Sequence, residues 1–255
     1  MLTRPQFALV AGLLSVSSGS PRTTAAQSPV LELDHAYVVV APGAAAAAEA
    51  LRRVGIVIDS NVTRHDGQGT ASRAAFFENT YLELLWVDSS VTVDSLHRLD
   101  LAEFVRAAKW RQSGASPFGI GLHFLSGTLA DLTIPTRLDS AARLRPGTYY
   151  VLLRQPEELL APDVFIMPDD RAVTTWLGRY RSRRPELFSH PWGVRRITRI
   201  FVRGPANQLP RSATLDTRLV RFEVANSPHL VLEFDGGHVG ETLDLRPALP
   251  VILQR

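Results

Sequence analysis

Two ionisable side chains lie in segments that are otherwise apolar. Glu83 lies within Tyr81-Leu-Glu-Leu-Leu-Trp-Val87, where strand alternation places it on one face with Tyr81. His35 lies within Leu31-Glu-Leu-Asp-His-Ala-Tyr-Val-Val-Val40, and the same alternation predicts that it shares a face with Leu33 and Tyr37. A carboxylate among apolar neighbours needs a cation, a hydrogen-bond donor or solvent. An inward imidazole and an inward carboxylate on two strands are therefore candidates for half of a metal site.

A third candidate, His123, follows two glycines in Pro117-Phe-Gly-Ile-Gly-Leu-His-Phe-Leu125. Alternation puts Gly119, Gly121 and His123 on one face, and the glycines leave room beside the imidazole for a ligand or cofactor. The alternative is a core histidine that is hydrogen-bonded to a backbone carbonyl. Both interpretations stay open.

A fourth histidine lies in the loop Phe188-Ser-His-Pro-Trp-Gly193. Proline holds His190 extended, and a histidine beside a tryptophan on a loop suits ligand binding. The alternative is a rigid turn that packs Trp192 against the core.

Composition narrows the classes of function. The chain has 255 residues, a formal net charge of +3 and no cysteine. Lys109 is the only lysine, so the basic character comes from arginine. The sequence has no stripe of alternating aromatic and basic residues of the kind that binds nucleic acid, so we expect no nucleic-acid partner. Without cysteine, a metal has only histidine, carboxylate and water as ligands.

The first 26 residues are typical of a secretory signal peptide. Arg4 provides a positive start, an apolar run from Phe7 to Val16 follows, and Thr24-Ala-Ala26 is a small-x-small cleavage sequence before Gln27. We expect a periplasmic or secreted protein cleaved near Ala26. No other apolar run has membrane length, so we expect no membrane partner after cleavage.

The elements that must position these residues begin with a β-α-β-β-β order. Further along, Glu233 lies in Leu-Val-Leu-Glu-Phe-Asp235 much as Glu83 lies in its own strand, which indicates a degenerate repeat of the first unit. The expected elements are a strand over 31–40, an alanine-rich helix ending at 53, a strand at 56–58, two strands over 69–87, a helix over 95–112, strands at 117–125, 148–154 and 163–168, an irregular polar stretch over 169–196, a strand over 196–203, and a hairpin of 219–224 with 228–235.

The chain resembles the vicinal oxygen chelate superfamily, and within it the glyoxalase-like group. The resemblance rests on Leu33-Asp-His-Ala-Tyr-Val-Val, on Gly69-Thr70, on Tyr81-Leu-Glu-Leu-Leu, and on Phe188-Ser-His-Pro-Trp-Gly before a new strand. It implies an α+β fold in which paired βαβββ modules form a cupped mixed sheet, as in glyoxalase, bleomycin-resistance and dioxygenase proteins. After the signal peptide over 1–26, the expected organisation is a glyoxalase-like domain over 27–205 and strands over 206–255 that complete the last module.

The resemblance also implies a divalent metal in the cup, which would be zinc, nickel, manganese or iron(II). His35 and Glu83 match the ligands of the first module, and His123 and Glu233 are the candidates from the second. Arg199 stands where a first-strand ligand would precede the last strands, and it cannot ligate a cation. Three interpretations stay open: a site made by His35, Glu83 and His123, a weakened site, or a metal-free cup in which Arg199 holds an anion.

Two functions follow from the resemblance. The leading hypothesis is a metal-dependent lyase, isomerase or dioxygenase that stabilises enolate-like charge on a small oxygenated substrate. Its candidate catalytic carboxylates are Glu83 and Glu233, and its candidate substrate contacts are Tyr37, Tyr81, His190, Trp192 and Arg199. The alternative is a metal-free protein of the same fold that binds or sequesters a small molecule. A partner subunit often completes such cups, so a homodimer is among the expected assemblies.

Overall fold

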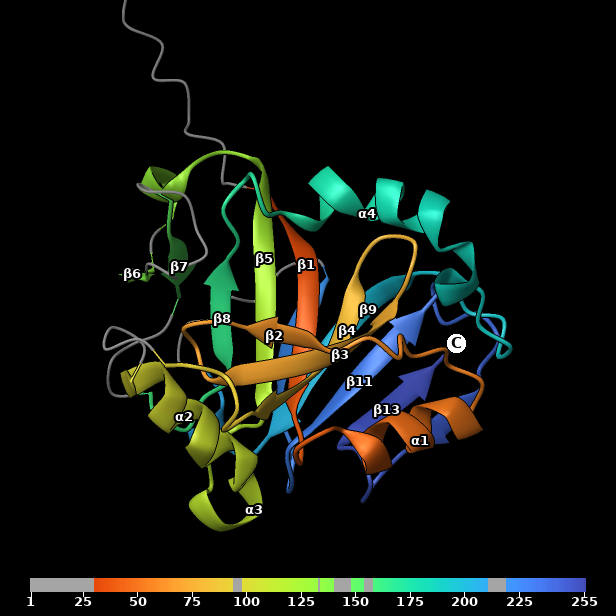
Figure 1. The fold of residues 1–255 in the computed structure, drawn as a ribbon, viewed down its shortest axis with the longest axis horizontal. Helices are drawn as coiled ribbons and strands as arrows, with labels where there is room; N and C mark the ends of the chain where they lie inside the picture. Colours follow the sequence, from red (N-terminus) through yellow and green to blue (C-terminus); the bar gives the residue numbers. More distant parts are fainter. Residues whose placement is uncertain (1–29, 94–97, 133, 140–147, 154–157, 211–218) are drawn as a thin grey trace, which may run out of the picture.

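The computed structural model describes residues 30–93, 98–132, 134–139, 148–153, 158–210 and 219–255, and the expected signal peptide lies outside them. These residues form an α+β fold with two mixed β-sheets and few helices, as expected (Figure 1). In the described part of the chain, no helix has the length and apolar character needed to cross a membrane.

The first sheet has eight strands in the order β2-β3-β4-β1-β5-β8-β7-β6. They are β1 (Val30–Val39), β2 (Thr63–His65), β3 (Thr70–Phe76), β4 (Tyr81–Val87), β5 (Phe118–Ser126), β6 (Arg137–Asp139), β7 (Tyr150–Leu152) and β8 (Asp163–Ile166). In the half that contains β1 to β4, β1 is parallel to β4, and β2, β3 and β4 are successively antiparallel. In the other half, β5 is parallel to β8, and β6, β7 and β8 are successively antiparallel. The halves meet where β1 and β5 pair antiparallel.

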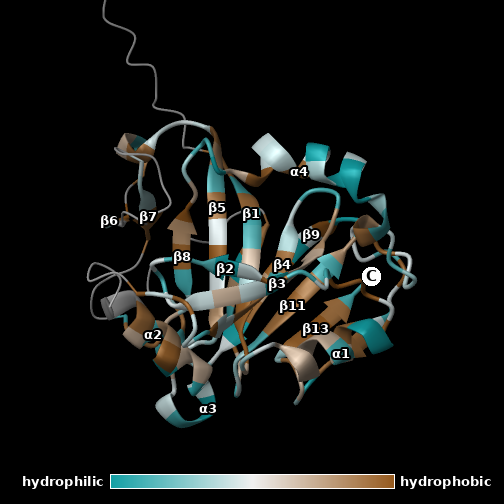
Figure 2. Ribbon diagram, in the orientation of Figure 1, coloured by the Kyte–Doolittle hydropathy of each residue, from teal (hydrophilic) through white to brown (hydrophobic). Residues whose placement is uncertain are grey.

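The second sheet has five strands in the order β10-β9-β11-β13-β12. They are β9 (Ile197–Gly204), β10 (Val220–Val224), β11 (His229–Phe234), β12 (Thr242–Asp244) and β13 (Val251–Gln254). The domain boundary expected at residue 205 therefore falls inside this sheet. Figure 2 shows that β11 and β13 are largely hydrophobic, which is typical of strands covered on both faces.

Alternation gives the first sheet a core face and an opposite, concave face. Ala36 and Leu84 are fully buried and belong to one hydrophobic cluster with Leu232 and Leu253 of the second sheet. The intervening residues of β1 and β4 point the other way and line a cavity. They are His35, Tyr37, Tyr81, Glu83 and Leu85.

A β-bulge in β1 changes one expected facing. Leu33 pairs with Leu122 and His35 pairs with Gly121, so Asp34 is an extra residue without a partner on β5. The bulge puts Leu33 in the core cluster and His35 on the concave face, so the expectation that they share a face is wrong.

The helices are α1 (Ala45–Arg53), α2 (Arg98–Ala108), α3 (Trp110–Ser113) and α4 (Val173–Arg183), with 3₁₀ turns η2 (Leu129–Asp131), η3 (Pro185–Phe188) and η4 (Ala206–Gln208). The alanine-rich α1 buries Ala47, Ala48 and Leu51 at helical spacing against the main core. It ends before Gly55, whose φ is 79° and whose added Cβ would lie 2.8 Å from the Trp192 nitrogen, so only glycine suits this position.

The helix α4 lies in the segment that the sequence analysis expects to be irregular. Val173, Trp176, Leu177 and Tyr180 follow helical spacing and pack with Phe76 in a small second cluster. The arginines on the outer face of α4 hide this apolar stripe in the sequence. In Figure 1, α4 lies across the ends of β1 and β4.

Two expected strand arrangements are also wrong. Residues 56–58 form no strand, because the amide of Ile56 donates to the Leu51 carbonyl and the amide of Val57 donates to the His190 Nδ1. The segments 219–224 and 228–235 form no hairpin with each other, because β9 lies between them. β9 is parallel to β10 and antiparallel to β11.

Candidate functional site

The concave face of the first sheet encloses a cavity of about 310 Å³. Aromatic rings form much of its wall, and they come from β1, β3, β4, α2, β7, β8 and α4. These rings are Tyr37, Phe76, Tyr81, Phe104, Tyr150, Phe165 and Trp176. Such a cavity has the size and surface of a site for one small molecule with an apolar body.

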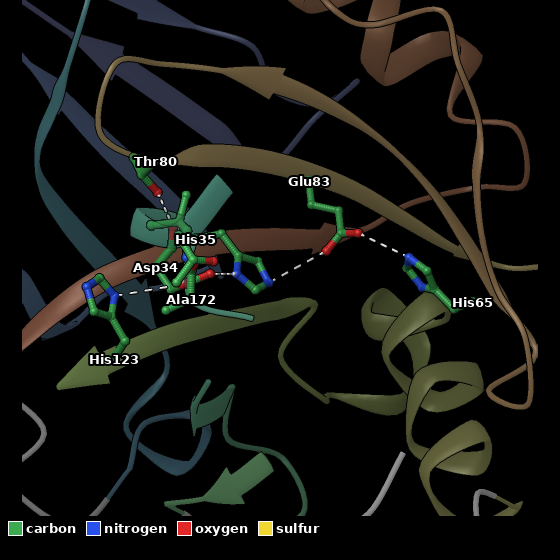
Figure 3. Close-up of polar contacts among 9 residues, drawn as sticks. Asp34, His35, His65, Thr80, Glu83, His123 and Ala172 are labelled. Carbon is green, nitrogen blue, oxygen red and sulfur yellow. Dashed lines mark hydrogen bonds and ion pairs between the residues drawn. The ribbon is translucent and has the colours of Figure 1, made fainter. Parts of the chain in front are cut away.

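Glu83 lies between two histidines in this cavity (Figure 3). One carboxylate oxygen is 3.8 Å from His35 Nε2, and the other is 3.5 Å from His65 Nε2. The Glu83 side chain is 13% exposed, so the carboxylate is largely shielded from water but open to the cavity. A carboxylate beside imidazole nitrogens can accept a proton from a bound molecule.

The bulge residue Asp34 holds His35 in place. The Asp34 Oδ1 accepts a hydrogen bond of 2.7 Å from His35 Nδ1, and its Oδ2 accepts one of 2.5 Å from the backbone amide of Val173 at the start of α4. Because an ionised carboxylate only accepts hydrogen bonds, His35 carries its proton on Nδ1 and turns Nε2 toward Glu83. The ring stacks on Tyr81 with centroids 4.5 Å apart, which fixes its plane.

His65, which lies between the strands expected at 56–58 and 69–87, is the second imidazole beside Glu83. It ends β2 and is 6% exposed. Its Nδ1 lies 2.9 Å from the Thr70 hydroxyl, and its Nε2 lies 3.4 Å from the Ser72 hydroxyl. These contacts orient the ring edge toward the carboxylate.

The far side of the cavity carries two more carboxylates, Asp163 on β8 and Glu103 on α2. The Tyr37 hydroxyl crosses between the two halves of the sheet and donates a hydrogen bond of 2.6 Å to Asp163. Gly119 makes this placement possible, because an added Cβ there would lie 2.0 Å from the Tyr37 ring.

His123 is buried beside this group but does not line the cavity. Its Nδ1 is 3.7 Å from Asp34 Oδ2, and its Nε2 is 3.5 Å from Glu32 Oε2. In Figure 3, His123 lies on the opposite side of Asp34 from His35 and Glu83. The structure therefore supports neither a bond from His123 to a backbone carbonyl nor its convergence with Glu83.

The expected three-ligand metal site does not fit this geometry. His35 and His65 face different oxygens of Glu83 from opposite sides, and His123 lies beyond Asp34 (Figure 3). Across the described ranges of the chain, no group of three or more histidine, aspartate or glutamate side chains is arranged to hold a metal ion.

The expected substrate contacts His190 and Trp192 do not line the cavity. His190 Nδ1 accepts a hydrogen bond of 3.0 Å from the Val57 amide, and His190 Nε2 donates one of 3.0 Å to the Phe76 carbonyl. Burial lowers the pKa of His190, in keeping with a neutral ring that joins backbone segments. Trp192 packs edge-on against Phe234, with centroids 5.7 Å apart.

Glu233 and Arg199 also lie away from the cavity, in the second sheet. They are register partners on β11 and β9, and their side chains form an ion pair of 3.5 Å. The Arg199 side chain is 46% exposed. The strands that carry Glu83 and Glu233 resemble each other in sequence, but they belong to two different sheets.

The structure brings together four of the expected site residues, His35, Tyr37, Tyr81 and Glu83. Sequence reasoning missed Asp34, His65, Asp163 and Trp176. The only signal for Asp34 was its place before His35, because a bulge leaves no mark in an alternating pattern. His65 had no such signal, since its strand has three residues.

Comparisons with known proteins identify no relative by sequence. No family model matches the chain, and no curated protein matches it. Among solved structures, the chain is similar to a hypothetical protein from Staphylococcus aureus, with 12% identity and a TM-score of 0.42 over 88% of this chain and 98% of the other.

Proposed function

We propose that this chain has a vicinal-oxygen-chelate-like fold, binds one small organic molecule in its cavity, and transfers a proton to and from that molecule through Glu83. The single observation that carries the proposal is the Glu83 carboxylate between two imidazole Nε2 atoms in a cavity walled by aromatic rings.

The strand order supports the fold assignment. The elements β1-α1-β2-β3-β4 form a unit in which the first strand lies beside and parallel to the last. The strands β5 to β8 repeat this order, with β5 beside and parallel to β8. Paired βαβββ modules have this arrangement, although in the described residues the second unit has only the short η2 where the first has α1. The second sheet is an addition to this plan.

The cavity wall supports binding of a molecule with a flat or apolar body. A volume of about 310 Å³ accommodates a compound of roughly the size of a substituted benzene ring, and the seven rings offer stacking surfaces. Two imidazoles, His35 and His65, flank Glu83 in the cavity wall, so the acidic proton of the bound molecule is expected to point there.

The surroundings of Glu83 support proton transfer. A shielded carboxylate takes a proton from an O–H or an activated C–H more readily than one in water, because less hydration must be lost. His35, oriented by Asp34, and His65, oriented by Thr70, lie on either side to stabilise the change in charge. Proton removal beside a carbonyl, or from a phenol, is therefore the reaction type that we propose.

A chromogenic phenol tests this proposal directly. The absorbance of 4-nitrocatechol moves to longer wavelength when its hydroxyl ionises, so titration at a pH where the free probe is protonated reports both binding and proton removal. We expect the shift with the wild-type protein, and binding without the shift for Glu83→Gln, which keeps the shape of the side chain. Glu223→Gln, at an exposed ion pair with Arg203 in the second sheet, is the matched control and should behave like wild type. An equal shift in Glu83→Gln, or no saturable binding of either 4-nitrocatechol or phenylglyoxal, would refute the proposal.

The alternative is a cavity that binds without chemistry. The observation that favours it is the aromatic wall itself, which needs no reacting group to hold an apolar molecule. Saturable binding of 4-nitrocatechol with no red shift in either wild type or Glu83→Gln would support this function over proton transfer.

A further inference from the structure

His123 is a buried histidine whose neighbours do not satisfy it. It is 3% exposed, and neither ring nitrogen has a hydrogen-bond partner. Both nitrogens nevertheless face carboxylates, Glu32 at 3.5 Å and Asp34 at 3.7 Å. A buried polar ring without bonds is unfavourable for folding, and it indicates a use other than packing.

His123 belongs to a continuous series of alternating carboxylates and imidazoles. From the cavity outward the series is Glu83, His35, Asp34, His123 and Glu32, with nearest separations of 3.8, 2.7, 3.7 and 3.5 Å. Figure 3 shows the first four of these groups in one line across β4, β1 and β5. Each member can both accept and donate a proton.

The β1 bulge creates this series. Regular alternation would have turned Asp34 into the hydrophobic core, but the extra residue at the bulge lets it contact His35 on one side and His123 on the other. Beyond the bulge, Glu32 is the register partner of His123, which brings their side chains together.

The two ends of the series lie in different surroundings. Glu83 faces the cavity, whereas Glu32 does not line it, and its side chain is 32% exposed. A molecule that fills a cavity of about 310 Å³ displaces the water that would otherwise carry away a proton. The series provides a second way out that does not pass through the cavity.

We propose that Glu32, His123 and Asp34 form a proton relay that connects the Glu83–His35 pair to solvent while the cavity is occupied. This deepens the proposed function and rests on it. Glu83 gives the substrate proton to His35 Nε2, and His35 Nδ1 gives its own to Asp34. Asp34 then turns about its Cβ–Cγ bond and gives that proton to His123 Nδ1, and His123 Nε2 gives its own proton to Glu32, which releases one to water.

One proton leaves the substrate and one reaches solvent, and each N–H or O–H bond that forms along the series is matched by one that breaks. The relay requires rotations of the Glu32, His123 and Glu83 side chains that shorten the three longer gaps to hydrogen-bond length. The same path in reverse returns a proton to the substrate and restores each imidazole tautomer.

The test separates proton removal from proton release. Stopped-flow mixing with 4-nitrocatechol in weak buffer follows probe ionisation by absorbance and proton release by the fluorescence of pyranine. In wild type the two signals should rise together. In His123→Gln and Glu32→Gln the probe should ionise with wild-type amplitude, while pyranine responds at least about tenfold more slowly, as for loss of one proton-transfer group.

Two controls make the result specific. His229→Gln removes another buried histidine, which lies in the second sheet and bonds to the Ser227 carbonyl, and it should leave both signals unchanged. His123→Gly opens space for free imidazole, which should restore the release rate. Glu32→Gln changes a partly exposed side chain, so it tests the relay even if the His123 variants fold poorly.

The outcomes distinguish the relay from the proposed function. Loss of probe ionisation in Glu83→Gln together with unchanged release in Glu32→Gln and His123→Gln would overturn the relay and leave Glu83 as the base. Probe ionisation that does not depend on Glu83 would overturn both. Slower release in the His229→Gln control to the same extent would also overturn the relay.

Discussion

The contact between Gly119 and Tyr37 gives a sharp prediction for Gly119→Ala. An added Cβ at Gly119 would lie 2.0 Å from Tyr37 Cε1 and 2.6 Å from its hydroxyl oxygen, distances that no carbon atom tolerates. The Tyr37 ring is 6% exposed and packs near Phe104 and Phe165, so it can leave only toward the cavity. The substitution therefore forces a choice between backbone movement and displacement of Tyr37.

The loss of folding free energy in Gly119→Ala has two parts. Overpacking of a buried site costs about 1–3 kcal/mol. Loss of the 2.6 Å hydrogen bond from Tyr37 to the Asp163 carboxylate adds about 1.5–3 kcal/mol, since the acceptor is charged. Because partial relaxation recovers some of each, we expect Gly119→Ala to lower the free energy of unfolding by about 3–5 kcal/mol, or the melting temperature by roughly 10 °C.

Urea denaturation followed by circular dichroism measures this change, and 4-nitrocatechol titration should show weaker binding because Tyr37 enters the cavity. Gly178→Ala is the matched control. It lies on the exposed face of α4 with nothing within 4 Å of an added Cβ, so alanine should stabilise the protein by about 0.5–1 kcal/mol through helix propensity.

A double-mutant cycle makes the test stricter. If the clash with Tyr37 is the cause, Gly119→Ala should cost much less in a Tyr37→Ala background. Equal costs in both backgrounds, or a Gly119→Ala protein as stable as wild type, would refute the reasoning.

Three further predictions concern titration and metal. Burial, with the hydrogen bond to Asp59, raises the pKa of Tyr180 to about 12 from 10, so folding favours the neutral phenol. The free energy of unfolding should be intact below pH 10 and fall as the pH rises toward 12. Tyr180→Phe should reduce this loss in urea titrations at alkaline pH. Burial lowers the pKa of His190 below its usual 6.5, so folding favours the neutral ring and this stability is present above pH 6.5 and lost as the pH falls through the folded value. NMR titration should show a pKa below 6.5 with the proton on Nε2, which donates to the Phe76 carbonyl, and a proton on Nδ1 would contradict the bonding. Thermal stabilisation by 4-nitrocatechol should survive EDTA, because no group of three or more described histidine or carboxylate side chains is arranged to hold a metal ion. Its loss in EDTA would show that a metal takes part.

Local pattern alone predicted much of the first sheet and half of the site. The alternation in 31–40 and 81–87 predicts β1 and β4 closely, because each strand has one face on a continuous core and the other on the cavity. It also predicts that Tyr37, Tyr81 and Glu83 point the same way. The glycines at 119 and 121 do not leave room for a ligand beside His123, because Tyr37 and His35 fill the space next to them.

The failures have specific physical causes. The helix α4 was missed because its arginines mask a stripe at helical spacing that is satisfied only by contact with Phe76 and its neighbours. The strand at 56–58 was wrong because the amides there bond to α1 and to His190, which no local pattern reveals. The hairpin near the end was wrong because β9, the strand that precedes both segments, lies between them in the sheet and pairs with each.

The sequence by itself determined the α+β fold class, the strands β1 and β4, and the place of His35 and Glu83 as ionisable side chains in otherwise apolar strands. These follow from side-chain periodicity and from the cost of burying charge, which are local properties. Only the tertiary structure decided which groups meet. The bulge at Asp34 and the antiparallel pairing of β1 with β5 join Glu32, His123 and Asp34 to His35, while the separate second sheet removes Glu233 and Arg199 from the cavity. Such pairings depend on contacts between residues that are distant in sequence, and alternation within one strand carries no information about them.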